Sequence, residues 1–215
     1  MRDGILLGEM MQSDGQTHSR TLLQMGEALL KNCAVSPEEL HAVAAAIGPG
    51  SFTGLRIGVA AAKGIAWGRE LPCVGVSTLE AMAHCTAAPD CIICCCMDAR
   101  RSQIYNALFE YSNGQWHRIC EDRAISAEDL KNELNYLKKQ KILVGDGAEL
   151  CYNTFGGSGE YLLAPQHLRL QRACGVAALA WEKCRAGQIG TAAELIPNYI
   201  RLSQAERERT EKEMK

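Results

Sequence analysis

A glycine-rich loop at residues 48–54 is the segment whose residue types and spacing most resemble a ligand-binding site. It reads Gly-Pro-Gly-Ser-Phe-Thr-Gly and stands between an apolar run and a helix-forming segment. Gly48 and Gly50 permit positive φ and a close approach of the backbone, and Ser51 and Thr53 can cap the helix that follows. Exposed N–H groups at a helix N-terminus suit an anion such as phosphate. The loop predicts either an anion site or a tight, capped strand-to-helix turn.

Two known nucleotide-binding motifs do not fit this loop. The Gly-Lys-Ser/Thr ending of a Walker loop is absent. The spacing of Gly48, Gly50 and Gly54 also differs from Gly-x-Gly-x-x-Gly. The motif alone therefore does not identify a nucleotide site.

Two aspartates could supply further chemistry. Asp98 follows the uncharged run 91–97, and Asp146 lies between Gly145 and Gly147. Paired carboxylates can bind a metal or move a proton, whereas Asp next to Gly is also an ordinary turn residue. Asp98 and Asp146 are therefore candidates for a polar site, with simple turn formation as the alternative.

The sequence contains 11 cysteines, and four of them gather in the run 91–97. A structural zinc site needs a second pair at suitable spacing, which Cys85 and Cys120 do not form. Reduced cysteine behaves as a small buried hydrophobe. The run therefore favours a fully buried strand, with a thiol-based redox or metal-storage function as an alternative for the protein.

These residues are expected on alternating strands and helices, which is typical of an α/β fold. Capping-box spacing marks helix starts at 36–39 and 77–80. The dipeptide at 113–114 predicts a hairpin between strands 103–110 and 115–120. Apolar periodicity predicts further strands over 4–11, 41–47, 71–76, 91–97 and 141–144, and helices over 18–33, 57–68, 126–137 and 174–186.

The bulk composition excludes some classes of protein. The formal net charge is -2, whereas a chain that binds an RNA backbone by itself usually has a basic excess. Any contact with RNA is therefore expected to be indirect. No stretch is long and apolar enough to cross a bilayer, and no apolar signal core follows the first residues. The sequence predicts a cytoplasmic protein without a membrane segment.

Several strings resemble the TsaB (YeaZ-like) family. The string AAAIGPGSFTGLRIGVAAAKGIAWGRELPCVGVSTLEAMA at 44–83 is similar to its signature stretch. Residues 97–109, 145–148 and 196–208 are family-like in the same order. The resemblance implies an ASKHA (actin/Hsp70-like ATPase) fold of two α/β lobes. In that fold positions such as Asp98 and Asp146 face the cleft between the lobes, so we expect these two residues to contribute polarity to the cleft. We expect these lobes at 1–90 and 91–202, with a charged tail at 203–215.

The resemblance also implies a role in forming N6-threonylcarbamoyladenosine at A37 of tRNA. The family's catalytic paralogue, TsaD, binds its metal with a His-x-x-x-His helix, and an ATPase, TsaE, docks where the subunits meet. Thr78 and Met82 stand at the two histidine positions here, and the nearby His84 has no partner at helical spacing. The resemblance thus implies a non-catalytic partner subunit with no cofactor of its own, which forms a homodimer when alone.

Two helices are expected to bind the partner. The resemblance implies that dimers pack the helices at 18–33 and 57–67 against their equivalents, and the glycines and alanines of the second helix permit a close approach. For Leu22 and Ala60 in this set, packing in the core is an open alternative. The predicted interface residues are Leu22, Leu23, Gly54, Arg56 and Ala60.

One departure from the family pattern concerns the N-terminus. Family members usually begin with a strand, an Asp-Thr-Ser turn and a second strand before the strand expected here at 4–11. This sequence lacks both strands, which predicts a truncated first lobe. An ATP-dependent phosphotransferase and a metallopeptidase of the same fold are the alternative functions, and both lack their characteristic residues here.

Overall fold

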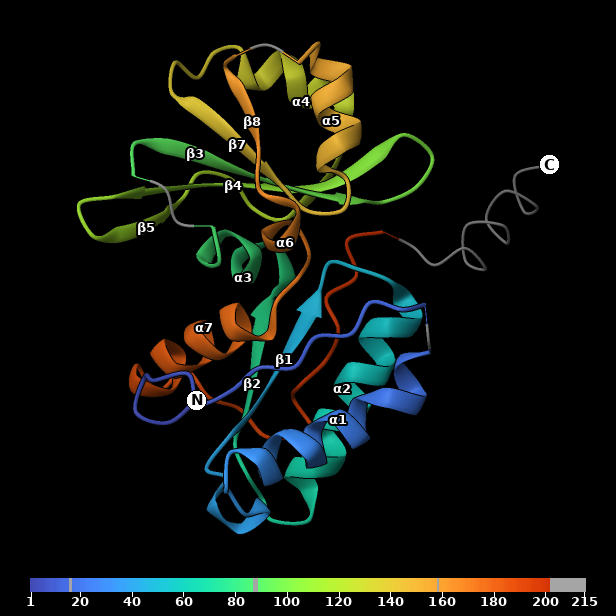
Figure 1. Ribbon diagram of the computed structural model, residues 1–215, viewed down its shortest axis with the longest axis vertical. Coiled ribbons are helices and arrows are strands. Elements are labelled where there is room, and N and C mark those ends of the chain that lie inside the picture. Colours follow the sequence, from blue (N-terminus) through green and yellow to red (C-terminus); the bar gives the residue numbers. More distant parts are fainter. Residues whose placement is uncertain (16, 87–88, 158, 202–215) are drawn as a thin grey trace, which may run out of the picture.

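The computed structural model describes residues 1–15, 17–86, 89–157 and 159–201. Its strands form two separate sheets, each with its own helices, so the chain builds two α/β lobes (Figure 1). No helix in these ranges is long and apolar enough to span a membrane.

The first lobe is built on two parallel strands. Strand β1 (Val43–Gly48) pairs with β2 (Cys73–Ser77), and helix α2 (Phe52–Trp67) forms the crossover between them. Alanines in β1 and α2 allow the helix to lie close to the sheet. Helix α1 (His18–Asn32) packs on the outside of α2, and a short 3-10 turn, η1 (Pro37–Glu39), precedes β1.

The second lobe contains a sheet of six strands in the order β5-β4-β3-β7-β8, with β6 also paired to β4. Strands β3, β7 and β8 run parallel, whereas β4 is antiparallel to β3, β5 and β6. The bounds are β3 (Cys91–Asp98), β4 (Gln103–Ser112), β5 (Gln115–Arg118), β6 (Arg123–Ser126), α4 (Ala127–Leu134), β7 (Gln140–Val144), α5 (Ala148–Phe155), β8 (Tyr161–Leu163) and α6 (Gln166–Arg169).

Strand β3 is buried on both faces up to Met97, as the uncharged run 91–97 predicts. Cys94 and Cys96 pack on one face in the cluster that includes residues of α4 and α5. Ile93 and Cys95 pack on the other face with residues of α3 (Thr78–His84). The alternation follows from the two-residue period of a strand, and these cysteines are therefore part of the core.

Helices α3 and α7 (Ala173–Arg185) pack against each other between the two sheets. Helix α3 contacts strands of both sheets, β3 and β4 of the second lobe and β1 and β2 of the first, whereas α7 contacts β1 and β2. The lobe boundaries expected at 1–90 and 91–202 stay a prediction. Within the second of these ranges, α7 lies against the first sheet, and the expected tail at 203–215 is outside the described residues.

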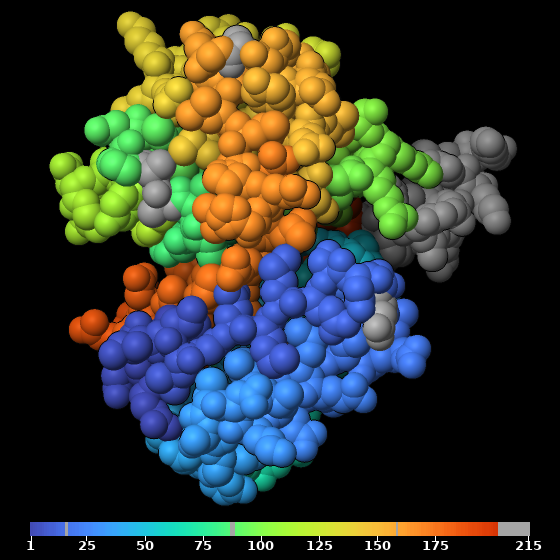
Figure 2. Space-filling model, in the orientation of Figure 1, coloured from blue at the N-terminus to red at the C-terminus, as the bar shows by residue number. Residues whose placement is uncertain are grey.

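The strand expected at 4–11 is wrong. Arg2 and Ile5 exchange backbone hydrogen bonds of 2.9 and 2.8 Å around a turn, and in the described chain no strand pairs with the residues that follow. A strand needs a neighbour for its ladder. Side chains hold the segment instead: Glu9 accepts hydrogen bonds from Arg172 and from the backbone N–H of Cys174. Figure 2 shows this segment spread over the first lobe beside α7.

Local signals correctly located other elements. Ser36 and Glu39 form the predicted capping box, and Ser77 Oγ accepts the N–H of Glu80 at 3.2 Å. The predicted hairpin forms between β4 and β5, with positive φ at both turn residues, Asn113 and Gly114. The helix expected at 18–33 is α1. By contrast, α2 begins at Phe52 rather than at 57, and β6, α5, β8 and α6 were not predicted.

A histidine between the lobes gives a pH-dependent prediction. Burial lowers the pKa of His84 from 6.5 to about 4, and its ring stacks on Trp116 at 4.5 Å between centroids. Between pH 6.5 and pH 4 the histidine is protonated in the unfolded chain but largely neutral in the folded chain. The free energy of unfolding should therefore fall by about 2 kcal/mol as the pH drops from 7 to 4, after allowance for partial exposure.

The comparison is urea unfolding of the wild type and His84→Phe at both pH values. Carboxylates titrate in both proteins, so the difference between them isolates the histidine. An equal loss in the variant would contradict the assignment.

Candidate partner surface and cleft residues

The loop at residues 48–54 is a capped turn packed against the end of the described chain. Gly48 has φ 129°, and a Cβ there would overlap the carbonyl oxygen of Asn198. Ser51 Oγ accepts the N–H of Gly54 at 3.3 Å and caps α2. Thr53 does not cap as predicted, because it already lies inside the helix.

An aromatic and arginine cluster joins this loop to residues 198–201. The backbone N–H of Asn198 donates to the carbonyl of Ile47 at 2.7 Å. The rings of Phe52 and Tyr199 stack at 4.2 Å, and Arg56 Nε donates to the Tyr199 hydroxyl at 3.0 Å. Periodicity gave no sign of this cluster, and the family-like string at 196–208 was the only signal that the segment mattered.

The structure brings Asp98 and Asp146 together at the carboxyl ends of β3 and β7. The backbone N–H of Asp98 donates to Asp146 Oδ1 at 3.2 Å. Partial burial raises the pKa of the Asp146 carboxyl, and the charge of Asp98 adds to this effect. A Cβ at Gly145 would overlap the carbonyl oxygen of Cys96, so glycine is required for this approach. The role of the pair, and of the loop residues Gly48, Gly50, Ser51 and Thr53, in a cleft stays a prediction.

Thr78 and Met82 are buried in α3. Thr78 Oγ1 lacks a hydrogen-bond partner among the residues that the structure describes. Met82 packs in the same cluster as Ile93 and Val144. Within the described ranges, no group of three or more His, Cys, Asp or Glu side chains is arranged for a metal ion.

The solvent face of α2 is a band of small residues between two large ones. Arg56, Ala60, Gly64 and Trp67 are exposed, and their spacing of four, four and three residues places them on one helix face. Apart from the two neighbouring residues and the nearby backbone of α2, no atom of the described residues lies within 4 Å of where a Cβ on Gly64 would be. Another helix could therefore approach this face closely. Trp67 is 73% exposed on this face, and it was not among the interface residues predicted from the sequence.

Helix α1 adds apolar surface. None of its residues is fully buried, and the side chains of Leu22 and Leu23 are 40% and 59% exposed. Leu22 and Ala60 therefore do not pack in the core of the single chain. Gly54 is half-buried beside His18. The assignment of these residues to a partner interface stays a prediction.

Known proteins match this chain over nearly its whole length. The family model described as TsaD: tRNA N6-adenosine threonylcarbamoyltransferase matches residues 10–208. The tRNA threonylcarbamoyladenosine biosynthesis protein TsaB of Bacillus subtilis (strain 168) is 31% identical over 210 residues, which cover 96% of this chain and 89% of that protein. The chain belongs to the TsaB (YeaZ-like) family. TsaB of Escherichia coli (strain K12) is 34% identical over 133 residues, which cover 60% of this chain and 58% of that protein.

Solved structures support the same fold for this TsaB-family chain. A Pseudomonas aeruginosa protein described as similar to the peptidase YeaZ superposes with a TM-score of 0.74 at 22% identity, covering 86% of this chain and 85% of that chain. The YeaZ structure from the same organism gives 0.73 at 22% identity, covering 86% and 84%. The two-lobed α/β arrangement is consistent with the actin/Hsp70-like (ASKHA) fold.

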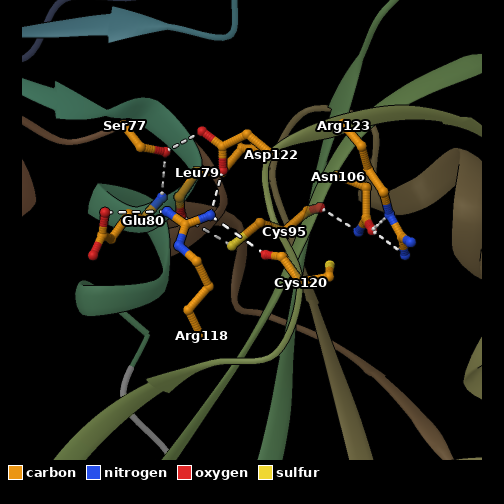
Figure 3. A network of polar contacts seen from close by, with 9 residues as sticks. All are labelled: Ser77, Leu79, Glu80, Cys95, Asn106, Arg118, Cys120, Asp122 and Arg123. Atoms are coloured by element: carbon orange, nitrogen blue, oxygen red, sulfur yellow. Dashed lines mark hydrogen bonds and ion pairs between the residues drawn. The ribbon is translucent and has the colours of Figure 1, made fainter. Parts of the chain in front are cut away.

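An ion network fastens α3 of the TsaB-family chain to the second sheet (Figure 3). Arg118 donates to Asp122 at 2.7 Å and to Glu80 at 3.1 Å. Its guanidinium also lies 4.6 Å from the centre of the Phe109 ring. Ser77 Oγ donates to Asp122 at 2.6 Å. The network therefore joins the start of α3 to β5 and the turn after it.

Replacing Arg118 with methionine should destabilise the protein by about 2 kcal/mol. The change removes the cation beside the Asp122 carboxylate, whose side chain is only 10% exposed. The hydrogen bond from Ser77 is then the interaction that remains for this carboxylate. Arg2→Met is the matched control, because the Arg2–Glu39 pair is exposed and should contribute less than about 1 kcal/mol. The change in the free energy of unfolding is measured for both variants by chemical denaturation. Equal losses in the two variants would show that the network adds no more than a surface ion pair.

Proposed function

We propose that this chain is the non-catalytic partner subunit of the machinery that forms N6-threonylcarbamoyladenosine at A37 of tRNA. The observation that carries the proposal is the match to the Bacillus subtilis biosynthesis protein TsaB over 96% of the chain. The family model over residues 10–208 supports the same assignment.

The side chains of α3 support a non-catalytic role. A tightly held metal needs ligands such as paired imidazoles on one helix face. At the positions where the catalytic paralogue has its histidines, this chain has the hydroxyl of Thr78 and the thioether of Met82. Both are buried in the core, and a thioether is a poor ligand for hard metals. The metal and the transfer step therefore belong to TsaD in this proposal.

The partner surface consists of the α2 face with Gly54, Arg56 and Ala60, together with Leu22 and Leu23 of α1. Small residues on α2 permit close helix packing, and exposed leucines on α1 give apolar area to bury. TsaD docks on this surface, a second copy of the chain occupies it when TsaD is absent, and TsaE binds where the two subunits meet. The net charge of -2 supports indirect contact with tRNA.

Reconstitution tests this proposal. Purified chain, the TsaD and TsaE of the same cell, ATP, threonylcarbamoyl-adenylate and tRNA are combined, and modified adenosine is measured by mass spectrometry after nuclease digestion. Modification is expected with the full set and not with this chain alone. Modification by the chain alone, or no binding to TsaD at micromolar concentrations, would overturn the proposal.

A further inference from the structure

Two cysteine thiols lie in contact where α3 and α7 cross. The Sγ atoms of Cys85 and Cys174 are 3.6 Å apart, although the residues are 89 positions apart in sequence. Cys85 follows the last residue of α3, and Cys174 is the second residue of α7. A disulfide has an S–S distance of about 2.04 Å, so the sulfurs need to approach by about 1.6 Å.

Solvent can reach this pair. Cys85 and Cys174 are both partly exposed. Cys85 also lines an open hollow of about 280 Å³, together with Thr86, Leu162 and Leu168. This hollow is large enough to admit a small oxidant, which makes the pair chemically accessible as well as close.

A second pair of thiols shows why distance alone does not suffice. The Sγ atoms of Cys94 and Cys96 are 3.5 Å apart, which is as close as the pair at the helix crossing. Both residues are fully buried in the core beneath α4 and α5, so an oxidant in water cannot reach them. These two residues also point from one face of a single strand, whereas Cys85 lies at the end of α3 and Cys174 lies in α7.

We propose that Cys85 and Cys174 are a redox-sensitive pair that forms a reversible disulfide when the protein meets a peroxide. Hydrogen peroxide transfers one oxygen to the Cys174 thiol, which becomes a sulfenic acid, and its other oxygen leaves as water. The Cys85 sulfur attacks that sulfur, the S–S bond forms, and the hydroxyl leaves with the Cys85 proton as a second water. Burial, and then the neighbouring Cys174, raise the pKa of the Cys85 thiol to about 12, so little of it is thiolate at neutral pH and its attack is the slow step.

The bond would fix the crossing of α3 and α7, which lies between the two sheets. Helix α3 contacts strands of both sheets, and α7 contacts the sheet of the first lobe. Their contact is close, because a Cβ on Gly175 would overlap the carbonyl oxygen of Ala81. A cross-link between positions 89 residues apart restricts the unfolded chain as well. The oxidised protein should therefore unfold at a higher temperature than the reduced protein.

Peptide mapping of the full chain tests the proposal. Reduced protein is treated with hydrogen peroxide in slight molar excess, blocked with iodoacetamide and digested without reductant. The expected product is a linked peptide pair containing Cys85 and Cys174, with two fewer free thiols than the 11 of the sequence, restored by dithiothreitol. A link at Cys94–Cys96, sulfinic acid without a link, or no loss of thiols would overturn the proposal.

Three single variants make the test specific. Cys85→Ser and Cys174→Ser should each abolish the linked peptide and the rise in melting temperature on oxidation. Cys91→Ser is the matched control, because Cys91 is also partly exposed and lies at the start of β3. The Cys91→Ser protein should still lose two free thiols on treatment with hydrogen peroxide. Mapping of the wild type decides the question even where a serine variant folds poorly, and a linked peptide in either pair variant would contradict the assignment.

Discussion

Replacing Ala60 with tryptophan is expected to weaken the proposed complex of the chain with TsaD at least about 100-fold, which corresponds to about 2.7 kcal/mol. Ala60 lies in the middle of the exposed band on α2, between Arg56 and Gly64. An indole there would hold a partner helix away from the backbone, and changes at the centre of an interface have the largest effects. Because Ala60 faces solvent in the single chain, the fold should tolerate the larger side chain.

The measurement is a titration of TsaD with each variant by calorimetry. Leu150→Trp is the control, since Leu150 is 44% exposed on α5 of the second lobe and lies outside the proposed surface. It should bind like the wild type. Wild-type affinity for Ala60→Trp would show that TsaD uses another face, and a circular dichroism spectrum confirms that each variant is folded.

Replacing Gly175 with alanine is expected to destabilise the protein by about 3 kcal/mol or more. A Cβ at this position would overlap the carbonyl oxygen of Ala81 and lie 2.8 Å from Cys85 Sγ. Both neighbours belong to the crossing of α3 and α7, which lies between the two sheets. The helices must separate to admit one methyl group, and such overpacking costs about 1–3 kcal/mol or more.

A second glycine provides the matched control. Gly26 also lies inside a helix, α1, but outside its neighbours and the local helix backbone the described residues place no atom within 4 Å of its Cβ position. Gly26→Ala should stabilise the chain by up to about 1 kcal/mol, because alanine has the higher helix propensity. Urea denaturation of both variants gives the comparison. A Gly175→Ala protein as stable as the wild type would show that the crossing of α3 and α7 accommodates the methyl group without loss of stability.

Several elements could be predicted from the sequence because their signals are local. The uncharged run 91–97 indicated a strand covered on both faces, and β3 is that strand. Ser77 and Ser126 cap helices within three residues of themselves, so no distant part of the chain is involved. The family motifs at 44–83 had the same advantage, because they can be read without knowledge of their neighbours.

Other features depended on neighbours that are far away in sequence. Residues 4–11 have a strand-like composition, yet the described chain provides no ladder partner, and Glu9 is held by Arg172 instead. The pairing of Asp98 with Asp146 needs two parallel strands to end side by side.

The sequence by itself therefore determined the family, most of the strands and helices, and the burial of the central cysteines. Only the tertiary structure decided which side chains meet across the chain, such as Phe52 with Tyr199 and Cys85 with Cys174. The reason is physical: periodicity and capping report the environment of a residue within its own element, whereas a contact between elements depends on how the sheets and helices pack.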